Sequence, residues 1–334
     1  MKKRTILKFL LLIFLLTACS TTVKYKIEHP SKIPMGKVQT VKLNKFEVNG
    51  TLDLIYQQDD KIVDQIFNFA ETKITQSSGN KAIKQYMFSN LLNKIANNQL
   101  YDVTENPNVY DAVIKGDIHY SVQDDHTKNK KEVKEKGGDG KTKTVTKYTY
   151  TLSRIANVTV NIRVNDNNGN IIGTSSVNKS TTEQITENSL ELAQENIENW
   201  QLIVNNTLNK TLTPIKHMVL PYHTFEQLSL KTGHSKLIKS ANKKAKKGNW
   251  QKALEVWNSK KESGNKEDRI ASLYNIAVYH EVHDDLDESI SIFEKLNLLS
   301  NSDKFNKDIE RVKQRKKEEK QLQEETGNKD GMKK

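Results

Sequence analysis

An alternating stretch at residues 156–173 decides the fold of the first half of the chain. It reads Ala-Asn-Val-Thr-Val-Asn-Ile-Arg-Val-Asn-Asp-Asn-Asn-Gly-Asn-Ile-Ile-Gly. Apolar side chains at every second position predict a strand with one buried face. Asn168-Gly169, placed between two such runs, is a strong hairpin signal. We therefore expect two antiparallel strands joined around Asp166–Asn170.

Further strands are predicted on the N-terminal side of this hairpin. The alternation from Val38 to Val48 indicates one strand, and the stretch from Tyr110 to Val122 indicates another, in which Gly116 could mark a bulge. The charged segment 123–147 contains Gly137-Gly138-Asp139-Gly140 and is expected to be a flexible loop that interrupts the sheet.

Amphipathic helices accompany these strands. Residues 62–74 and 83–95 have apolar side chains at helical spacing, and so does a longer segment from Leu190 to Leu208. Helices mixed with local hairpins predict an α+β domain over residues 37–222.

This order of elements resembles the α/β domain shared by curli-secretion channel lipoproteins and the lipoprotein activators of penicillin-binding proteins. The residues that carry the resemblance are the helix-to-strand passage 91–103, the strand 111–116 and the hairpin 160–172. It implies an envelope protein and brings no catalytic motif with it. Channel members insert hairpins of alternating apolar residues into the membrane, whereas residues 128–134 read Lys-Asn-Lys-Lys-Glu-Val-Lys, which argues against a pore.

From Ser235 onward the pattern is helical and contains an internal repeat. At a constant offset of 36 residues, Ala241, Gly248, Trp250, Ala253 and Trp257 correspond to Ala277, Asp284, Leu286, Ser289 and Phe293. This register resembles tetratricopeptide repeats, whose usual period is about 34 residues. Two units, over residues 235–312, are too few to bury a continuous core. We expect a cap, either a helix that begins near Asp303 or docking on the first domain, and a charged, disordered tail over residues 313–334.

The first 18 residues predict an export signal. A basic start, Met1-Lys2-Lys3-Arg4, precedes the apolar run Phe9–Leu16, which is too short to cross a hydrocarbon core of about 30 Å. The next residues, Leu16-Thr17-Ala18-Cys19, resemble the lipobox of bacterial lipoproteins. The resemblance implies cleavage between Ala18 and Cys19 and fatty acylation of Cys19, with an ordinary signal and an incidental cysteine as the alternative.

Residues 19–36 include Pro30 and Pro34 and are expected to form an extended, lipidated tether. Ser20 follows the cysteine; in the sorting rule of two-membrane bacteria an aspartate there would retain the protein at the inner membrane. Serine therefore implies the outer membrane, facing the periplasm. Cys19 is the sole cysteine of the sequence, so no intramolecular disulfide is expected.

The chain is basic, with a formal net charge of +12. Removal of the signal takes away Lys2, Lys3, Arg4 and Lys8, and 12 − 4 leaves +8. For an exported protein this surplus favours anionic lipid headgroups or acidic envelope polymers over nucleic acid as partners. Lysines that merely solvate helices explain it equally well.

The sequence carries no motif for catalysis, for a metal or for a cofactor. His280-Glu281-Val282-His283 is one residue short of the metalloprotease pattern His-Glu-x-x-His, because Asp284 stands where the second histidine is needed. No Gly-x-Ser-x-Gly is present. Four aromatic residues are candidates either for a partner-binding groove or for the core of the repeats: Trp250, Trp257, Tyr274 and Tyr279.

Together these features predict a non-enzymatic, membrane-anchored envelope lipoprotein that acts as a protein-interaction scaffold or assembly factor. Envelope proteins are the expected partners, and a homo-oligomer is left open. Two other hypotheses stay open: a subunit of an oligomeric curli-type secretion channel, and a hydrolase or metal enzyme whose site is assembled from scattered residues.

Overall fold

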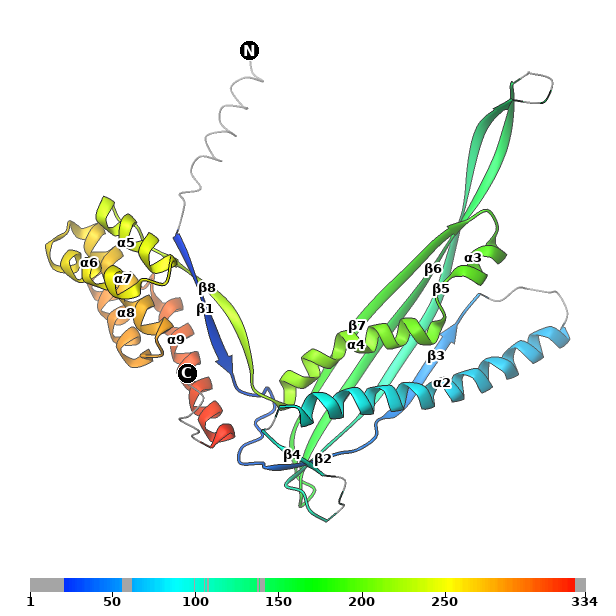
Figure 1. Ribbon diagram of the computed structural model, residues 1–334, viewed down its shortest axis with the longest axis horizontal. Helices are drawn as coiled ribbons and strands as arrows, with labels where there is room; N and C mark the ends of the chain where they lie inside the picture. Colours follow the sequence, from blue (N-terminus) through cyan, green and yellow to red (C-terminus); the bar gives the residue numbers. More distant parts are fainter. Residues whose placement is uncertain are drawn as a thin grey trace. The chain divides into compact units, whose positions relative to one another are not determined.

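The structure, a computed structural model, describes residues 21–55, 62–98, 100–104, 106, 108–136, 138 and 142–327. They form two compact units (Figure 1). The sheet unit spans Ser31–Leu220 with residues 325–327, and the helical unit comprises residues 21–30 and 221–324. One unit is built on a mixed sheet and the other mainly on helices, so the predicted α+β class is confirmed.

A six-stranded mixed sheet forms the frame of the sheet unit. Its strands are β2 (Thr40–Leu43), β3 (Glu47–Asp53), β4 (Asp102–Thr104), β5 (Ala112–Lys136), β6 (Thr142–Asp166) and β7 (Ile171–Glu187). The order is β4-β2-β5-β6-β7, with β3 also beside β5. Strands β2 and β3 run parallel to β5, while β5, β6 and β7 are antiparallel neighbours. The predicted hairpin at Asp166–Asn170 therefore joins β6 to β7.

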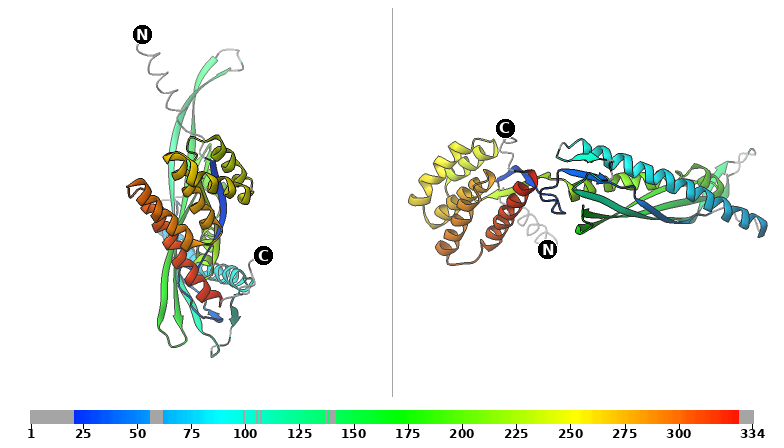
Figure 2. Two further views of the ribbon diagram at one scale, coloured as in Figure 1. Left: turned by 90° about the vertical axis from the view of Figure 1, so that its left-hand side faces the viewer. Right: turned by 90° about the horizontal axis from the view of Figure 1, so that it is seen from below.

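One face of this sheet is covered by helices (Figure 2). They are α2 (Ile62–Ala96), α3 (Leu190–Asn196) and α4 (Trp200–Val219). The two helical segments expected at 62–74 and 83–95 belong to the single helix α2. The alternating side chains of β6, such as Val158 and Ile162, share one core with Leu91 of α2 and Leu208 of α4.

The charged segment 123–147 differs from the predicted flexible loop. Strand β5 continues to Lys136 and β6 begins at Thr142, and the two stay paired as far as Lys136 and Thr142. The physical reason is the composition of the returning strand: residues 142–152 include five threonines and two tyrosines, which favour extended backbone. Hydrogen bonds from this part of β6 then hold the lysine-rich end of β5 in the sheet, although that end lacks apolar alternation.

Gly116 does not mark a bulge, because it pairs in register with Ile162. A shift in register occurs elsewhere, between Val164 and Asn165. Glycine is needed at position 116 because an added Cβ would lie 2.1 Å from the main-chain oxygen of Asn161 and 2.6 Å from the ring of Phe46.

Gly116→Ala is therefore expected to destabilise the sheet unit by about 1–3 kcal/mol, the usual cost of overpacking. Urea denaturation followed by circular dichroism measures the change. Gly138→Ala is the matched control, because an added Cβ there meets no described atom within 4 Å. Equal stability of the two variants would contradict the account of close packing at Gly116.

The helical unit begins with a strand where a tether is predicted. Strand β1 (Thr21–His29) pairs antiparallel with β8 (Tyr222–Leu230) along its whole length. Val23, Tyr25 and Ile27 are buried, while the side chains between them point to solvent. This period-two pattern outweighs the low overall hydrophobicity of the segment, so the expected tether over residues 19–36 is wrong for its central part. Cys19 and Ser20 lie outside the described residues.

Five helices complete this unit: α5 (Lys236–Lys246), α6 (Trp250–Ser263), α7 (Lys266–Val282), α8 (Leu286–Ser300) and α9 (Asn306–Thr326). The 36-residue offset relates α5–α6 to α7–α8. Gly248 and Asp284 both end the first helix of a pair with positive φ, 82° and 62°, and Trp257 and Phe293 are both fully buried.

Helix α9 caps the second helical hairpin: its residues Ile309 and Val312, together with Phe305 just before the helix, join the same core. The disordered tail expected over residues 313–334 is thus helical up to Thr326, and residues 328–334 lie outside the described part. Within the described residues, every helix is too short or too polar to cross a membrane.

Candidate functional site

A buried carboxylate, that of Glu281, holds three elements of the helical unit together. The side chain of Glu281 is fully buried near the end of α7. Arg311 of α9 donates two hydrogen bonds to it, from Nη2 to Oε2 at 2.8 Å and from Nε to Oε1 at 3.0 Å. The hydroxyl of Tyr25 on β1 donates to Oε1 at 3.2 Å. Paired, bidentate geometry of this kind compensates the cost of burying the charges.

Two further groups extend this network. Arg315, one turn after Arg311, donates from Nη1 to the main-chain oxygen of Glu281 at 2.6 Å and from Nη2 to Asp284 at 2.7 Å. Asp308 accepts from Nη1 of Arg311 at 2.6 Å. The α7–α8 turn is therefore fixed to α9 by charge-assisted hydrogen bonds from Arg311 and Arg315 to Glu281 and Asp284.

The surroundings shift the ionisation of two of these groups. Burial raises the pKa of Tyr25 well above its ordinary value, and the negative charge of Glu281 adds to this effect. Burial alone would lower the pKa of Arg311, but its hydrogen bonds to Glu281 and Asp308 outweigh burial and raise it. At neutral pH Tyr25 is thus a neutral donor and Arg311 a permanent cation.

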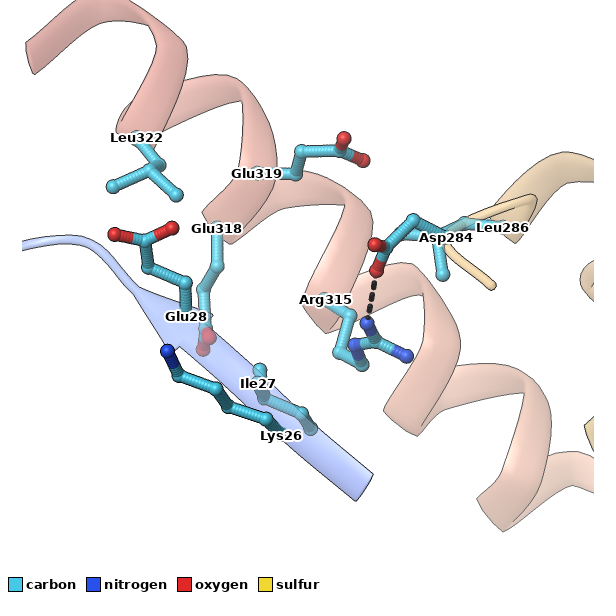
Figure 3. A pocket seen from close by; sticks show the side chains of 9 residues that line it. All are labelled: Lys26, Ile27, Glu28, Asp284, Leu286, Arg315, Glu318, Glu319 and Leu322. Atoms are coloured by element: carbon cyan, nitrogen blue, oxygen red, sulfur yellow. Dashed lines mark hydrogen bonds and ion pairs between the residues drawn. The ribbon is translucent and has the colours of Figure 1, made fainter. Parts of the chain in front are cut away.

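Beside this network lies a pocket with a volume of about 230 Å³ (Figure 3). Strand β1, helix α9 and the α7–α8 turn each contribute to its lining. The lining residues are Lys26, Ile27, Glu28, Asp284, Leu286, Arg315, Glu318, Glu319 and Leu322. Arg315 of α9 binds Asp284 of the α7–α8 turn, and both residues line the pocket. The Glu281 network therefore forms one wall of the pocket.

The pocket combines acidic side chains with apolar ones. Two of its four carboxylates are engaged: Asp284 binds Arg315, and Glu318 accepts a 2.9 Å contact from His29. The carboxylates of Glu28 and Glu319 make no hydrogen bond or ion pair to the rest of the described chain. The apolar part comes from Ile27, Leu286 and Leu322. Such a lining suits a basic side chain that carries its aliphatic stem along apolar surface.

The four predicted aromatic candidates differ in how deeply they are buried in the helical unit. Trp257 is fully buried and donates from Nε1 to Asn242 at 3.1 Å. Tyr274 is 8% exposed. Trp250 and Tyr279 are partly buried and pack against each other, with 6.1 Å between ring centroids. None of the four lines the pocket described above. Trp257 and Tyr274 are therefore core residues of the helical unit, and a partner-binding role for Trp250 and Tyr279 stays a prediction.

The two histidines of the incomplete zinc motif, His280 and His283, each contact a different group of the chain. His280 Nδ1 lies 2.9 Å from Asp285, and His283 Nδ1 lies 2.7 Å from the main-chain oxygen of Tyr279. Across the described ranges, no three His, Cys, Asp or Glu side chains are grouped so that they could hold a metal ion. Ala18 and Cys19, the predicted cleavage and lipidation residues, lie outside the described residues.

Sequence reasoning missed the Glu281 network. The sequence does contain a signal for this network. Glu281 follows Tyr274, Ala277 and Val278 on the buried face of its helix. A charged side chain on an apolar face needs a partner, because burying an unpaired charge is costly. Arg311 and Arg315 are spaced by one helical turn, which places both guanidinium groups on one face of α9.

Comparison with known proteins gives one family match. Residues 239–324 match a family model described as a domain of unknown function, DUF6340. The match runs from α5 into α9 and covers less than half of the chain. A search of curated proteins finds no match.

Three solved structures illustrate the more distant likenesses. A neuraminyllactose-binding hemagglutinin homolog from Helicobacter pylori is 11% identical, with 53% of this chain and 81% of that chain covered, at a TM-score of 0.30. A minor lipoprotein from Acinetobacter baumannii is 11% identical, with 53% of this chain and 92% of that chain covered, at a TM-score of 0.21. A PelC dodecamer from Paraburkholderia phytofirmans is 12% identical, with 58% of this chain and 97% of that chain covered, at a TM-score of 0.22. These low scores establish neither fold nor function.

Proposed function

We propose that this protein is a lipid-anchored envelope protein whose helical unit docks a basic segment of a partner protein. The observation that carries the docking role is the pocket between β1, α9 and the α7–α8 turn, whose lining combines Glu28 and Glu319 with apolar side chains. The anchoring role rests on the signal sequence and on Cys19, which give an exported chain a fixed attachment to the membrane.

The pocket is suited to binding because its walls are already ordered. Arg311 fixes α9 to the carboxylate of Glu281, and Arg315 fixes α9 to Asp284 in the turn. Tyr25 fixes β1 to the same Glu281 carboxylate. Binding of a partner therefore costs conformational entropy of the partner segment but not of the pocket. A preorganised site of this kind raises affinity, because less entropy is lost on binding. Two carboxylates left without a protein cation supply charge complementarity, which guides both specificity and the rate of association.

Photo-crosslinking in cells tests this proposal. A photoreactive residue in place of Glu319 is expected to give one discrete adduct, whose crosslinked partner segment contains Lys or Arg next to an apolar residue. The matched control places the same residue at Glu324, an exposed position on the same helix outside the pocket. We expect no adduct there.

Reversing the charge at Glu28 tests whether the crosslinked partner binds in the pocket or is only close to it. Glu28→Lys, a change on an exposed side chain, is expected to lower the yield of the Glu319 adduct at least about tenfold, which is the loss for about 1.4 kcal/mol. Exchange of the crosslinked basic residue of the partner for Glu should restore it. The same adduct from positions 319 and 324, or a yield that Glu28→Lys leaves unchanged, would refute docking at the pocket.

A further inference from the structure

Strands β5 and β6 extend beyond the rest of their sheet. The last pair between β6 and β7 joins Tyr150 to Glu187, whereas β5 and β6 pair with each other as far as Lys136 and Thr142. We call this two-stranded extension, residues 128–136 and 142–149, the hairpin arm. It projects past β7 as a free ribbon (Figure 1). Apart from Val133 and Thr149, its described residues are exposed.

The hairpin arm is strongly basic. Its described residues carry seven lysines against Glu132 and Glu135, a net charge of +5. The glutamates engage two of the lysines, with Lys147 at 2.6 Å from Glu135 and Lys130 at 3.4 Å from Glu132. The arm therefore holds a large share of the positive charge of the mature chain on a thin, solvated ribbon.

One face of the arm combines lysines with tyrosines. Side chains alternate along a strand, so the even-numbered residues of both strands share a face. They are Lys128, Lys130, Glu132, Lys134, Lys136, Thr142, Thr144, Thr146 and Tyr148. Lys128 Nζ lies 4.5 Å from the ring centre of Tyr148 and 5.2 Å from that of Tyr150. Tyr148 is 44% exposed, so its ring is accessible to a partner surface.

We propose that the hairpin arm binds the surface of an anionic lipid bilayer. Lysine ammonium groups pair with lipid phosphates, and each basic residue near such a surface adds to the binding. Tyrosine favours the membrane–water interface because its ring is apolar and its hydroxyl polar. Lysines occur on both faces of the arm, including Lys131 and Lys143 on the face opposite Lys128, so the arm lies on the bilayer and does not span it.

This inference is independent of the docking pocket and of the lipid on Cys19. An exposed tyrosine distinguishes a bilayer from a soluble polyanion, because a polyanion gains from the lysines alone. The protein for the test is the mature chain with Cys19→Ser, so that no acyl chain contributes to binding.

Co-sedimentation with vesicles tests it. We expect binding to vesicles of equal parts phosphatidylglycerol and phosphatidylcholine, and none to phosphatidylcholine alone. Raising the NaCl concentration from about 0.1 to 1 M should abolish binding, because the Debye length falls from about 10 to 3 Å. Exchange of Lys128, Lys130, Lys134 and Lys136 for Gln should weaken binding at least about thirtyfold.

A matched variant controls for net charge. Exchange of Lys243, Lys244, Lys246 and Lys247 for Gln, all exposed in or just after α5, removes the same charge and should weaken binding less than about threefold. Tyr148→Ala should weaken vesicle binding about threefold or more at unchanged charge, and leave binding to inorganic polyphosphate unchanged.

Three results would overturn the proposal. Equal losses from the two four-lysine variants would show that the whole chain attracts the vesicles and the arm has no special part. Polyphosphate binding as tight as vesicle binding, with Tyr148→Ala without effect on either, would assign the arm to a soluble polyanion. Binding to dihexanoyl-phosphatidylglycerol monomers as tight as to vesicles would also contradict a bilayer surface.

Discussion

Arg311→Ala is expected to lower the free energy of unfolding of the helical unit by about 3–5 kcal/mol. The variant leaves Glu281 fully buried without its bidentate partner, and the remaining contacts are the hydroxyl of Tyr25 and Nη1 of Arg315, 3.9 Å from Oε1. An ionised carboxylate in such a site costs several kcal/mol.

Tryptophan fluorescence during urea denaturation measures this loss. The chain has three tryptophans, and a Trp200→Phe background leaves only Trp250 and Trp257, both in the helical unit. Lys313→Ala, an exposed change on the same helix, serves as the control and should stay within about 0.5 kcal/mol.

A double variant, Glu281→Met with Arg311→Met, sharpens the test. Because it removes both charges and keeps the volume, it should recover much of the stability that Arg311→Ala loses. A double variant as unstable as Arg311→Ala would show that packing, and not the unpaired charge, sets the loss.

Loss of the lipid should release the exported protein from the membrane. Chains that carry an ordinary cleavable export signal in place of residues 1–19 are expected to move from the membrane pellet to the supernatant after a high-salt wash. The wash removes electrostatic contacts, and two acyl chains are what makes anchoring stable. The matched control joins the same foreign signal to Leu16-Thr17-Ala18-Cys19 and should stay in the pellet. Both chains in the pellet would contradict anchoring through Cys19.

Much of the architecture can be predicted from periodicity. Alternation at 156–173 gives the β6–β7 hairpin, and the 36-residue offset gives the two helical hairpins, because each pattern reports which face of an element is buried. The cap near Asp303 follows from the same reasoning, because two hairpins alone leave an apolar face open.

Other features escape periodicity for identifiable reasons. Strand β1 has only Val23, Tyr25 and Ile27 as a signal, and its partner β8 lies about 200 residues away in the sequence. The hairpin arm is held by ladder hydrogen bonds with almost no apolar burial, so its hydropathy resembles that of a loop.

The pocket depends on contacts that are distant in the sequence. Glu28 and Glu319 lie on β1 and α9, and both lining elements meet at Glu281 through Tyr25 and Arg311. A sequence shows that a buried charge needs a partner but not which distant residue supplies it. A sequence pattern therefore indicates only candidate residues that recur within one segment of the chain, such as the aromatic residues of the repeat.

The mass of the N-terminal peptide of the protein purified from membranes tests most directly whether it is a lipid-anchored envelope protein. We predict a mature chain that begins at Cys19, with fatty acyl chains on that residue, and incorporation of labelled palmitate that Cys19→Ala abolishes. A mature N-terminus at another residue, or an unmodified Cys19 in protein that stays in the membrane through a high-salt wash, would contradict this account.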